Sequence, residues 1–280
     1  MRIKVWGCRG SLTSPGSETV RYGGNTTCFE IRLQDGTLLI LDAGSGIHKL
    51  GKKLLGEAGI TELFLILTHS HWDHVLGFPF FTPAYLDRYS IHVRGGPTGK
   101  LSLKKYLEHQ MDPPFFPVEF DLLKARFDFD YEDPYEQDIG SAKVIPIALS
   151  HPNGAYGFKI LEGERSFIFM TDNELGADHK GGLARKDYIR FCEGADLLVH
   201  DAQYSDDEYR MTRGWGHSTF RDAVNFGMES GVKRLGITHH DPDHTDPELD
   251  NYFEFCSGIV REAASKMDCF FVTEGMEITL

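Results

Sequence analysis

The segment His69-Ser70-His71-Trp72-Asp73-His74 places three imidazoles and one carboxylate within six residues. Histidine nitrogens and carboxylate oxygens together suit Zn²⁺ and are also accepted by iron and manganese ions. One catalytic zinc ion takes about three protein ligands, so a single loop that supplies four predicts two metal ions. Later parts of the chain would then have to complete the two coordination shells.

Short apolar runs carry the residues that could complete such a site. Residues 38–44, 63–69, 167–172, 195–202 and 235–240 have the length and flanking residues of buried strands. Open sheets gather functional groups at the carboxyl ends of their strands. We therefore expect His151, Asp172 and His239 to join the loop, with His240 as an alternative to His239.

The segments between these runs have the periodicity of helices. One predicted helix covers residues 46–55, a second starts at Ser218, and a third is capped by Asp246 with Pro247 at its first position. Strands that alternate with helices predict the α/β or α+β class. A weak similarity between residues 63–71 and 234–241 indicates two similar halves.

These residues together resemble the metallo-β-lactamase superfamily. The resemblance rests on His69-x-His71-x-Asp73-His74, on Asp42 in "LILDAG", and on three later residues, His151, Asp172 and His239. It implies one domain over residues 1–280, built as an αββα sandwich of two mixed β-sheets flanked by helices. The family pattern further implies one metal on His69, His71 and His151, the other on Asp73, His74 and His239, with Asp172 bridging and Asp42 behind the ligands. Asp73 would also be part of the catalytic machinery.

A second resemblance concerns "VHDAQY" (199–204) and "GWGHSTFRDA" (214–223), which are similar to the tRNase Z and cyclic-phosphodiesterase branch. It implies that His217 protonates the leaving oxygen and that Asp201 orients His217, although tRNase Z usually has glutamate at the position of Asp201. The stretches "WGCRGS" and "RYGGNTTCFEIRL" resemble bacterial proteins described by similarity as phosphoribosyl cyclic phosphodiesterases. That likeness would place Asn25 near the substrate, but Gly-Gly-Asn is also a common turn.

The resemblance implies a phosphodiesterase of small cyclic or nucleotide-like phosphodiesters, with a metal-bridging hydroxide and two divalent transition metal ions. Zinc is the expected metal, and manganese or iron are alternatives. True β-lactamases of this superfamily generally have cysteine at the position of Asp172, which argues against lactam hydrolysis. Only 21 positions separate His151 from Asp172, which leaves no room for the tRNA-gripping arm of tRNase Z. Three alternatives remain: a tRNA 3′-processing endonuclease, a thioester or lactone hydrolase, and a non-catalytic metal-bound ligand sensor.

The composition bears on partners and location. A net charge of -13 repels nucleic acid and favours a small-molecule substrate. Five scattered cysteines without a C-x-x-C pair argue against a disulfide framework and favour a cytoplasmic location. No run of about 18 apolar residues predicts a membrane span. Relatives in this family often form homodimers, but the residues themselves do not predict one.

Residues 108–138 form the most irregular region, since proline, phenylalanine and acidic residues alternate there. The prolines oppose regular structure while the phenylalanines need cover, which predicts an ordered insertion or lid. Met111, Phe115 and Phe116 would either line a pocket for a base or seal the insertion.

Overall fold

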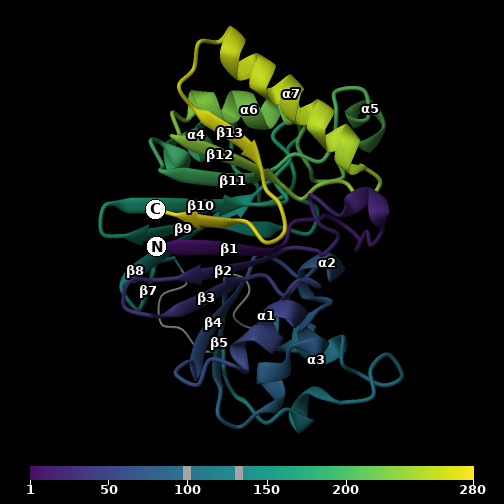
Figure 1. Ribbon diagram of the computed structural model, residues 1–280, viewed down its shortest axis with the longest axis vertical. Helices are drawn as coiled ribbons and strands as arrows, with labels where there is room; N and C mark the ends of the chain where they lie inside the picture. Colours follow the sequence, from purple (N-terminus) through teal and green to yellow (C-terminus); the bar gives the residue numbers. More distant parts are fainter. Residues whose placement is uncertain (97–101, 130–134) are drawn as a thin grey trace.

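Two seven-stranded sheets form the centre of the computed structural model, which describes residues 1–96, 102–129 and 135–280. Helices lie over the outer face of each sheet, and the two sheets face one another (Figure 1). The layers are thus helix, sheet, sheet, helix. This arrangement confirms the predicted αββα sandwich.

The first sheet has the order β14-β1-β2-β3-β4-β5-β6. Its strands are β1 (Arg2–Gly7), β2 (Cys28–Arg32), β3 (Leu38–Leu41), β4 (Glu62–Leu67), β5 (Ser90–Gly95), β6 (Arg126–Asp128) and β14 (Glu277–Thr279). Strands β3 to β6 are parallel to one another, whereas β14 pairs antiparallel with β1, β1 with β2, and β2 with β3. The sheet is therefore mixed.

The second sheet has the order β13-β12-β11-β10-β9-β8-β7. Its strands are β7 (Gln137–Ile139), β8 (Ala142–Leu149), β9 (Ala155–Glu162), β10 (Arg165–Met170), β11 (Leu197–Asp201), β12 (Arg234–Thr238) and β13 (Asp268–Phe271). Strands β10 to β13 are parallel, and β7 to β10 pair antiparallel. Each sheet thus contains a parallel half whose strand ends meet at one edge.

The apolar runs of the sequence are continuous because both faces of these strands are buried. In β3, Leu39 and Leu41 pack between the sheets, while Leu38 and Ile40 pack under the outer helices. The same alternation holds in β10, where Phe167 and Phe169 face inward and Ile168 and Met170 face outward. Phe29 of β2 meets Phe169 of β10 across the interface, with ring centroids 4.9 Å apart.

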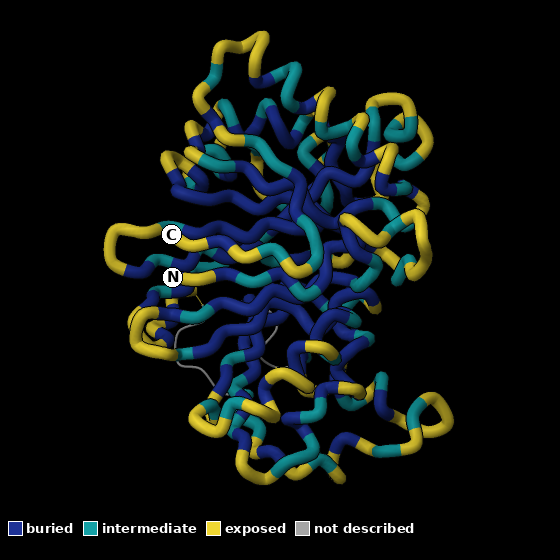
Figure 2. Tube along the Cα trace, in the orientation of Figure 1, coloured by how far each residue is buried: buried dark blue, intermediate teal, exposed yellow. Residues whose placement is uncertain are grey.

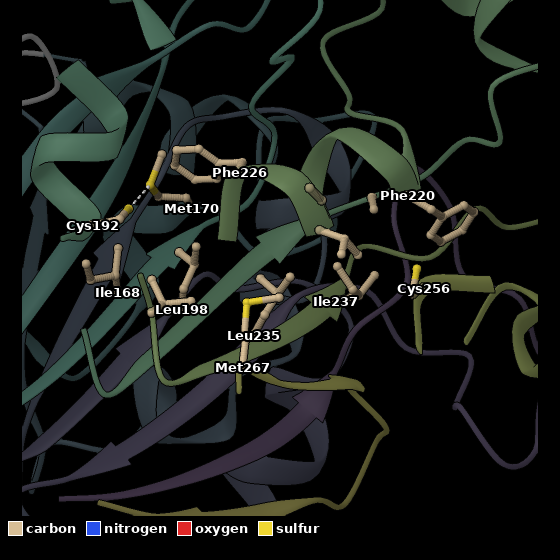
Figure 3. Packing of buried hydrophobic residues seen from close by; sticks show 14 of the residues in the cluster. Ile168, Met170, Cys192, Leu198, Phe220, Phe226, Leu235, Ile237, Cys256 and Met267 are labelled. Carbon is tan, nitrogen blue, oxygen red and sulfur yellow. Dashed lines mark hydrogen bonds between the residues drawn. The ribbon is translucent and has the colours of Figure 1, made fainter. Parts of the chain in front are cut away.

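The outer helices bury the other face of each sheet. Figure 3 shows Leu198, Leu235 and Ile237 of the second sheet beneath side chains from the helices, including Phe220 and Phe226. The helices are α1 (Ile47–Leu54), α2 (Trp72–Val75), α3 (Leu103–His109), α4 (Arg185–Cys192), α5 (Tyr209–Thr212), α6 (Phe220–Glu229) and α7 (Asp246–Glu262). Short 3₁₀ turns are η1 (Ser17–Thr19), η2 (Phe78–Phe80), η3 (Thr82–Tyr85) and η4 (Phe120–Leu122).

Two predicted helix starts are wrong by one residue. The cap of α6 is Thr219, which accepts a hydrogen bond from the Asp222 amide, and not Ser218. The cap of α7 is Thr245, whose backbone amide and hydroxyl both donate to Glu248, so Asp246 is already helical. In each case two adjacent residues can cap a helix, and the side-chain contact that forms decides between them: one hydrogen bond at α6 and a reciprocal pair at α7.

The described part of residues 108–138 contributes to both sheets. Strand β6 extends the first sheet beside β5, and β7 extends the second beside β8. Met111 is fully buried in the core under the first sheet and Phe116 packs against that core, while Phe115 is 74% exposed. Residues 130–134 of the predicted lid lie outside the described residues.

Burial follows the strands and the inner faces of the helices (Figure 2). Cys8, Cys28, Cys192 and Cys256 are buried free thiols, and Cys269 is partly buried. No helix within the described ranges has both the length and the apolar character that crossing a membrane requires.

Candidate metal centre

Strand ends from both sheets deliver the predicted site residues to one place. Asp42 follows β3, His69 follows β4, His151 follows β8, Asp172 follows β10 and His239 follows β12. Three of them, Asp42, Asp172 and His239, have φ angles of 60°, 60° and 61°. This left-handed conformation is uncommon for a residue other than glycine and is concentrated at functional sites. In each case it turns the chain sharply as the strand ends.

His69, His71 and His151 form the first group of ligand atoms. Nε2 of His151 lies 3.0 Å from Nδ1 of His71. Nδ1 of His69 lies 3.0 Å from the Thr68 hydroxyl, and its Nε2 is buried without a hydrogen-bond partner. Nδ1 of His151 donates to the Gly216 carbonyl at 2.9 Å, so Nε2 is the free nitrogen. Each imidazole therefore turns one nitrogen toward a common point.

Asp73, His74, Asp172 and His239 form the second group. Nε2 of His239 lies 3.0 Å from Asp73 Oδ2, and Nε2 of His74 lies 3.3 Å from the same oxygen. The Ser11 amide donates to Asp73 Oδ2 at 2.8 Å, which fixes the carboxylate. All four side chains are buried.

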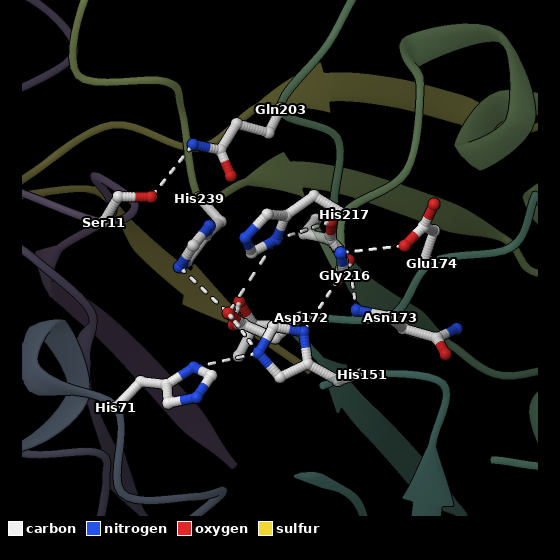
Figure 4. Close-up of polar contacts among 12 residues, drawn as sticks. Ser11, His71, His151, Asp172, Asn173, Glu174, Gln203, Gly216, His217 and His239 are labelled. Atoms are coloured by element: carbon white, nitrogen blue, oxygen red, sulfur yellow. Dashed lines mark hydrogen bonds and ion pairs between the residues drawn. The ribbon is translucent and has the colours of Figure 1, made fainter. Parts of the chain in front are cut away.

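Asp172 belongs to the second group and also faces the first, and in Figure 4 it lies among the imidazoles of His71, His151, His217 and His239. Its Oδ1 is 3.9 Å from Nε2 of His69, 3.8 Å from Nε2 of His151 and 3.4 Å from Nε2 of His239. Its Oδ2 is 3.2 Å from Nε2 of His74. One carboxylate thus faces ligand atoms of both groups, as a bridging ligand would.

Burial and neighbouring charges shift the pKa values of imidazoles in the two groups in opposite directions. Burial lowers the pKa of His69 well below its usual value, and it lowers the pKa of His151 to about 4. These imidazoles are neutral near pH 7 and keep a lone pair for a metal ion. Burial also tends to lower the pKa of His74, but Asp73, Asp172 and Asp42 raise it well above the usual value. The carboxylates around His74 thus favour a positive charge at this point.

The donor set fits two divalent cations. Buried polar atoms normally have hydrogen-bond partners, yet Nε2 of His69 and Nε2 of His74 have none. The nitrogen and oxygen atoms of each group lie within 4.8 Å of one another, as they would around a metal ion. A cation at each point would use these free atoms and would supply the positive charge that the carboxylates favour.

Asp42 lies directly behind the ligands. Its carboxylate accepts hydrogen bonds from Nδ1 of His74 at 2.8 Å and from the Thr68 amide at 2.8 Å. The Thr68 hydroxyl also contacts this carboxylate, at 2.9 Å, and Nδ1 of His69 contacts that hydroxyl. Asp42 therefore orients two of the imidazoles at once.

His217 lies beside Asp172 and over His239. Its ring stacks on that of His239 with centroids 4.9 Å apart, and its Nδ1 is 3.8 Å from Asp172 Oδ1. Asp201 Oδ2 is 3.6 Å from the same nitrogen, which is longer than a hydrogen bond. The Asp201 carboxylate accepts hydrogen bonds from the amides of Asn173 and Ser218. Asp201 thus positions the segment that carries His217, without a direct hydrogen bond to the imidazole.

Two other predicted positions lie apart from the cluster. The Asn25 side chain donates to Glu274 and accepts from Ser45, so its polar atoms are used within the fold. His240, the alternative to His239, contacts the Val272 carbonyl and stacks on Phe271. The structure brings His239 to the metal ligands and leaves His240 in the core.

The residues that hold the site together through backbone contacts were not among the predicted site residues. Thr68 is one, although the repeated Thr-His of Thr68-His69 and Thr238-His239 was a signal for it. Glu174, two residues after Asp172, is 1% exposed and receives hydrogen bonds from four other residues. A buried acidic residue so near a ligand could have been suspected from "TDNELG".

Comparisons with known proteins identify the family and the fold. The family model for a beta-lactamase superfamily domain matches residues 39–245. A protein named ribonuclease Z from Haloarcula marismortui is 26% identical, over 85% of this chain and 86% of its own length. The yeast PDE1 structure superposes with a TM-score of 0.71 at 16% identity and covers 100% of this chain and 99% of its own. A diphosphatase of the PhnP family gives a TM-score of 0.68 at 17% identity, over 100% of this chain and 97% of its own.

Proposed function

This chain belongs to the beta-lactamase superfamily and is a hydrolase of the metallo-β-lactamase fold, and we propose that it cleaves small cyclic or nucleotide-like phosphodiesters. The observation that carries the proposal is the convergence on Asp172. Both groups of ligand atoms and His217 surround this one carboxylate. A centre for two cations with a proton donor at its edge is suited to phosphodiester hydrolysis.

Donor atoms of three overlapping groups lie close enough to hold a cation, one of them made of His151, Asp172 and His217, and the family pattern selects the other two. His69, His71 and His151 would hold one, Asp73, His74 and His239 the other, and Asp172 would contact both. Two bound divalent cations, with zinc as the expected metal, would supply Lewis acidity toward a phosphoryl oxygen and a water molecule of lowered pKa.

His217 would serve as the proton donor to the leaving oxygen. Its Nδ1 faces the carboxylates of Asp172 and Asp201, which leaves Nε2 as the atom that carries a proton to the substrate. Protonation matters when an alkoxide leaves, since an alkoxide is a strong base. A positioned general acid typically accelerates such a step by about 10²–10⁴-fold.

Three features favour a small substrate with an aromatic base. The residues between His151 and Asp172 are largely taken up by β9 and β10, which pair as a hairpin. A pocket beside His69 and His71 is lined by Tyr106 and Asn153, among others. Trp72, next to His71, is 77% exposed, and Trp215, next to Gly216, is 62% exposed. Exposed indole rings beside a phosphate-cleaving site would stack on a base.

RNA is the second candidate substrate, on the evidence of the relatives. The prediction from net charge argued against a nucleic-acid partner, but a relative matched over most of the chain is named ribonuclease Z. A net charge of -13 describes the whole surface, and a local groove can still bind a polyanion. Precursor tRNA therefore belongs among the substrates tested.

A substrate panel tests the proposal. Purified protein loaded with Zn²⁺, Mn²⁺ or Fe²⁺ would be assayed on 2′,3′- and 3′,5′-cyclic nucleotides, cyclic ribose phosphates, precursor tRNA, a thioester and a lactone. We expect the highest kcat/KM on a nucleotide-like phosphodiester. Preferred cleavage of precursor tRNA, or of the acyl substrates, would overturn the assignment, and so would tight substrate binding without turnover, which would indicate a sensor.

A further inference from the structure

Glu174 is a buried carboxylate that is fully occupied by donors. Its Oε1 accepts from the Tyr209 hydroxyl at 2.6 Å and from the Gly214 amide at 2.7 Å. Its Oε2 lies 2.6 Å from Nε2 of His179 and accepts from the Gly216 amide at 2.8 Å. No metal ligand is among these partners, so the carboxylate acts on the site through the 209–216 segment.

The backbone around Glu174 is tied to two other segments of the site. The Glu174 amide donates to the Ser150 carbonyl at 2.8 Å, directly before His151. The Leu175 amide donates to the Ser218 hydroxyl at 3.0 Å, directly after His217. The Glu174 segment therefore joins the chain segments that carry His151, Asp172 and His217.

Gly216 connects this carboxylate to the imidazole of His151. Its amide donates to Glu174 while its carbonyl accepts from Nδ1 of His151 at 2.9 Å, as Figure 4 shows. Gly216 has φ 99°, and a Cβ at this position would lie 2.1 Å from that Nδ1. Only glycine allows this close approach. The position of one peptide unit thus sets the direction of the imidazole.

We propose that Glu174 is a positioning residue of the metal centre, which fixes the Gly214–Gly216 backbone so that the Gly216 carbonyl holds His151 on Nδ1 and leaves Nε2 for the metal ion. The proposal rests on the metal centre of the proposed function but not on its substrate. A histidine that ligates through Nε2 generally donates its other N–H to such an acceptor, and removing outer partners typically weakens metal affinity by about 10–100-fold.

A carboxylate is required at this position because each of its oxygens accepts from a backbone amide, Gly214 on Oε1 and Gly216 on Oε2. An ionised carboxylate accepts at both oxygens, whereas glutamine has one accepting oxygen and an NH₂ group that donates. In Glu174→Gln the NH₂ group would meet a backbone amide that can only donate, either that of Gly214 or that of Gly216. Glutamine has nearly the same size as glutamate, so the variant tests the hydrogen bonding at this position and not the packing.

The test compares Glu174→Gln with Glu164→Gln, in which the same change is made at an exposed position of the β9–β10 turn. Zn²⁺ affinity would be measured by competition with a chromophoric chelator, together with kcat and KM. We expect Glu174→Gln to weaken affinity about 10–100-fold and to lower kcat more than KM changes. Glu164→Gln should match the wild type. A folded Glu174→Gln protein with affinity and kcat within twofold of the wild type would overturn the proposal.

A measurement on the wild type keeps the proposal testable if the variant does not fold. Long-range ¹H–¹⁵N correlation spectra report which nitrogen of His151 carries the proton, with a His151→Gln spectrum for assignment. We expect the proton on Nδ1, and a proton on Nε2 instead would overturn the proposal. Tight Zn²⁺ binding without phosphodiesterase activity would refute the proposed function while leaving this proposal intact.

Discussion

Oδ2 of Asp42 lies 2.8 Å from Nδ1 of His74. Asp42 follows β3, a strand that supplies no metal ligand. The same carboxylate accepts from the Thr68 amide, so it fixes both an imidazole and the start of the ligand loop. In Asp42→Asn only one of the two side-chain oxygens remains an acceptor. We expect metal affinity to fall by about 10–100-fold, measured by chelator competition.

The control for this prediction is Asp207→Asn, because the Asp207 side chain is 86% exposed and far from any ligand in sequence. It should bind metal as the wild type does. Equal affinities for Asp42→Asn and the wild type would show that Asp42 does not orient His74.

Removal of the metal ions should lower thermal stability. Free cations at a concentration of about 100 times their dissociation constant would add about 2.7 kcal/mol to the free energy of unfolding. Each kcal/mol raises the thermal unfolding midpoint of a chain of this size by about 2–4 °C. We therefore expect excess chelator to lower the unfolding midpoint by about 5–10 °C in calorimetry. Asp172→Ala, which removes the shared carboxylate, should bind fewer than two metal ions and respond less to chelator. An unchanged wild-type midpoint would contradict the metal centre.

The cluster of candidate metal ligands could be predicted from sequence because it consists of particular residue types at a fixed spacing. His69, His71, Asp73 and His74 are adjacent in sequence, and the later ligands follow apolar runs that are recognisable as buried strands. The helix, sheet, sheet, helix layering followed from the same runs and from the family resemblance.

The supporting contacts could not be predicted because they depend on backbone positions that only the fold defines. The four donors to Glu174 come from residues 179, 209, 214 and 216, and two of them are backbone amides. Asp201, predicted to orient His217, lies 3.6 Å from Nδ1 of that imidazole, and its carboxylate accepts hydrogen bonds from the amides of Asn173 and Ser218. Residue types alone give no information about such amide contacts.

His217→Ala should separate proton donation from metal binding. The imidazole is not in either ligand group of the proposed dinuclear centre, so metal content should match the wild type. We expect kcat to fall by about 10²–10⁴-fold on a phosphodiester with an alkoxide leaving group. The loss should be much smaller with p-nitrophenolate, which leaves without a proton.

The exposed residue His109 provides the matched control, and His109→Ala should leave kcat unchanged on both substrates. An equal loss for the two leaving groups in His217→Ala would remove the role of general acid from His217.

The packing between the sheets should control both stability and the metal centre. Phe29 and Phe169 meet across the interface at 4.9 Å, and the chain runs from Phe169 to Asp172 within three residues. Phe169→Ala would leave a cavity between the two sheets and should lower the free energy of unfolding by about 3–5 kcal/mol in urea titration. The first sheet supplies His69 to His74 and the second supplies His151, Asp172 and His239, so a shift between the sheets should also weaken metal affinity.

The control is Phe115→Ala, which removes a side chain that is 74% exposed and should change the free energy of unfolding by less than about 1 kcal/mol. A loss below about 1 kcal/mol in Phe169→Ala would show that this aromatic pair does not hold the two sheets together.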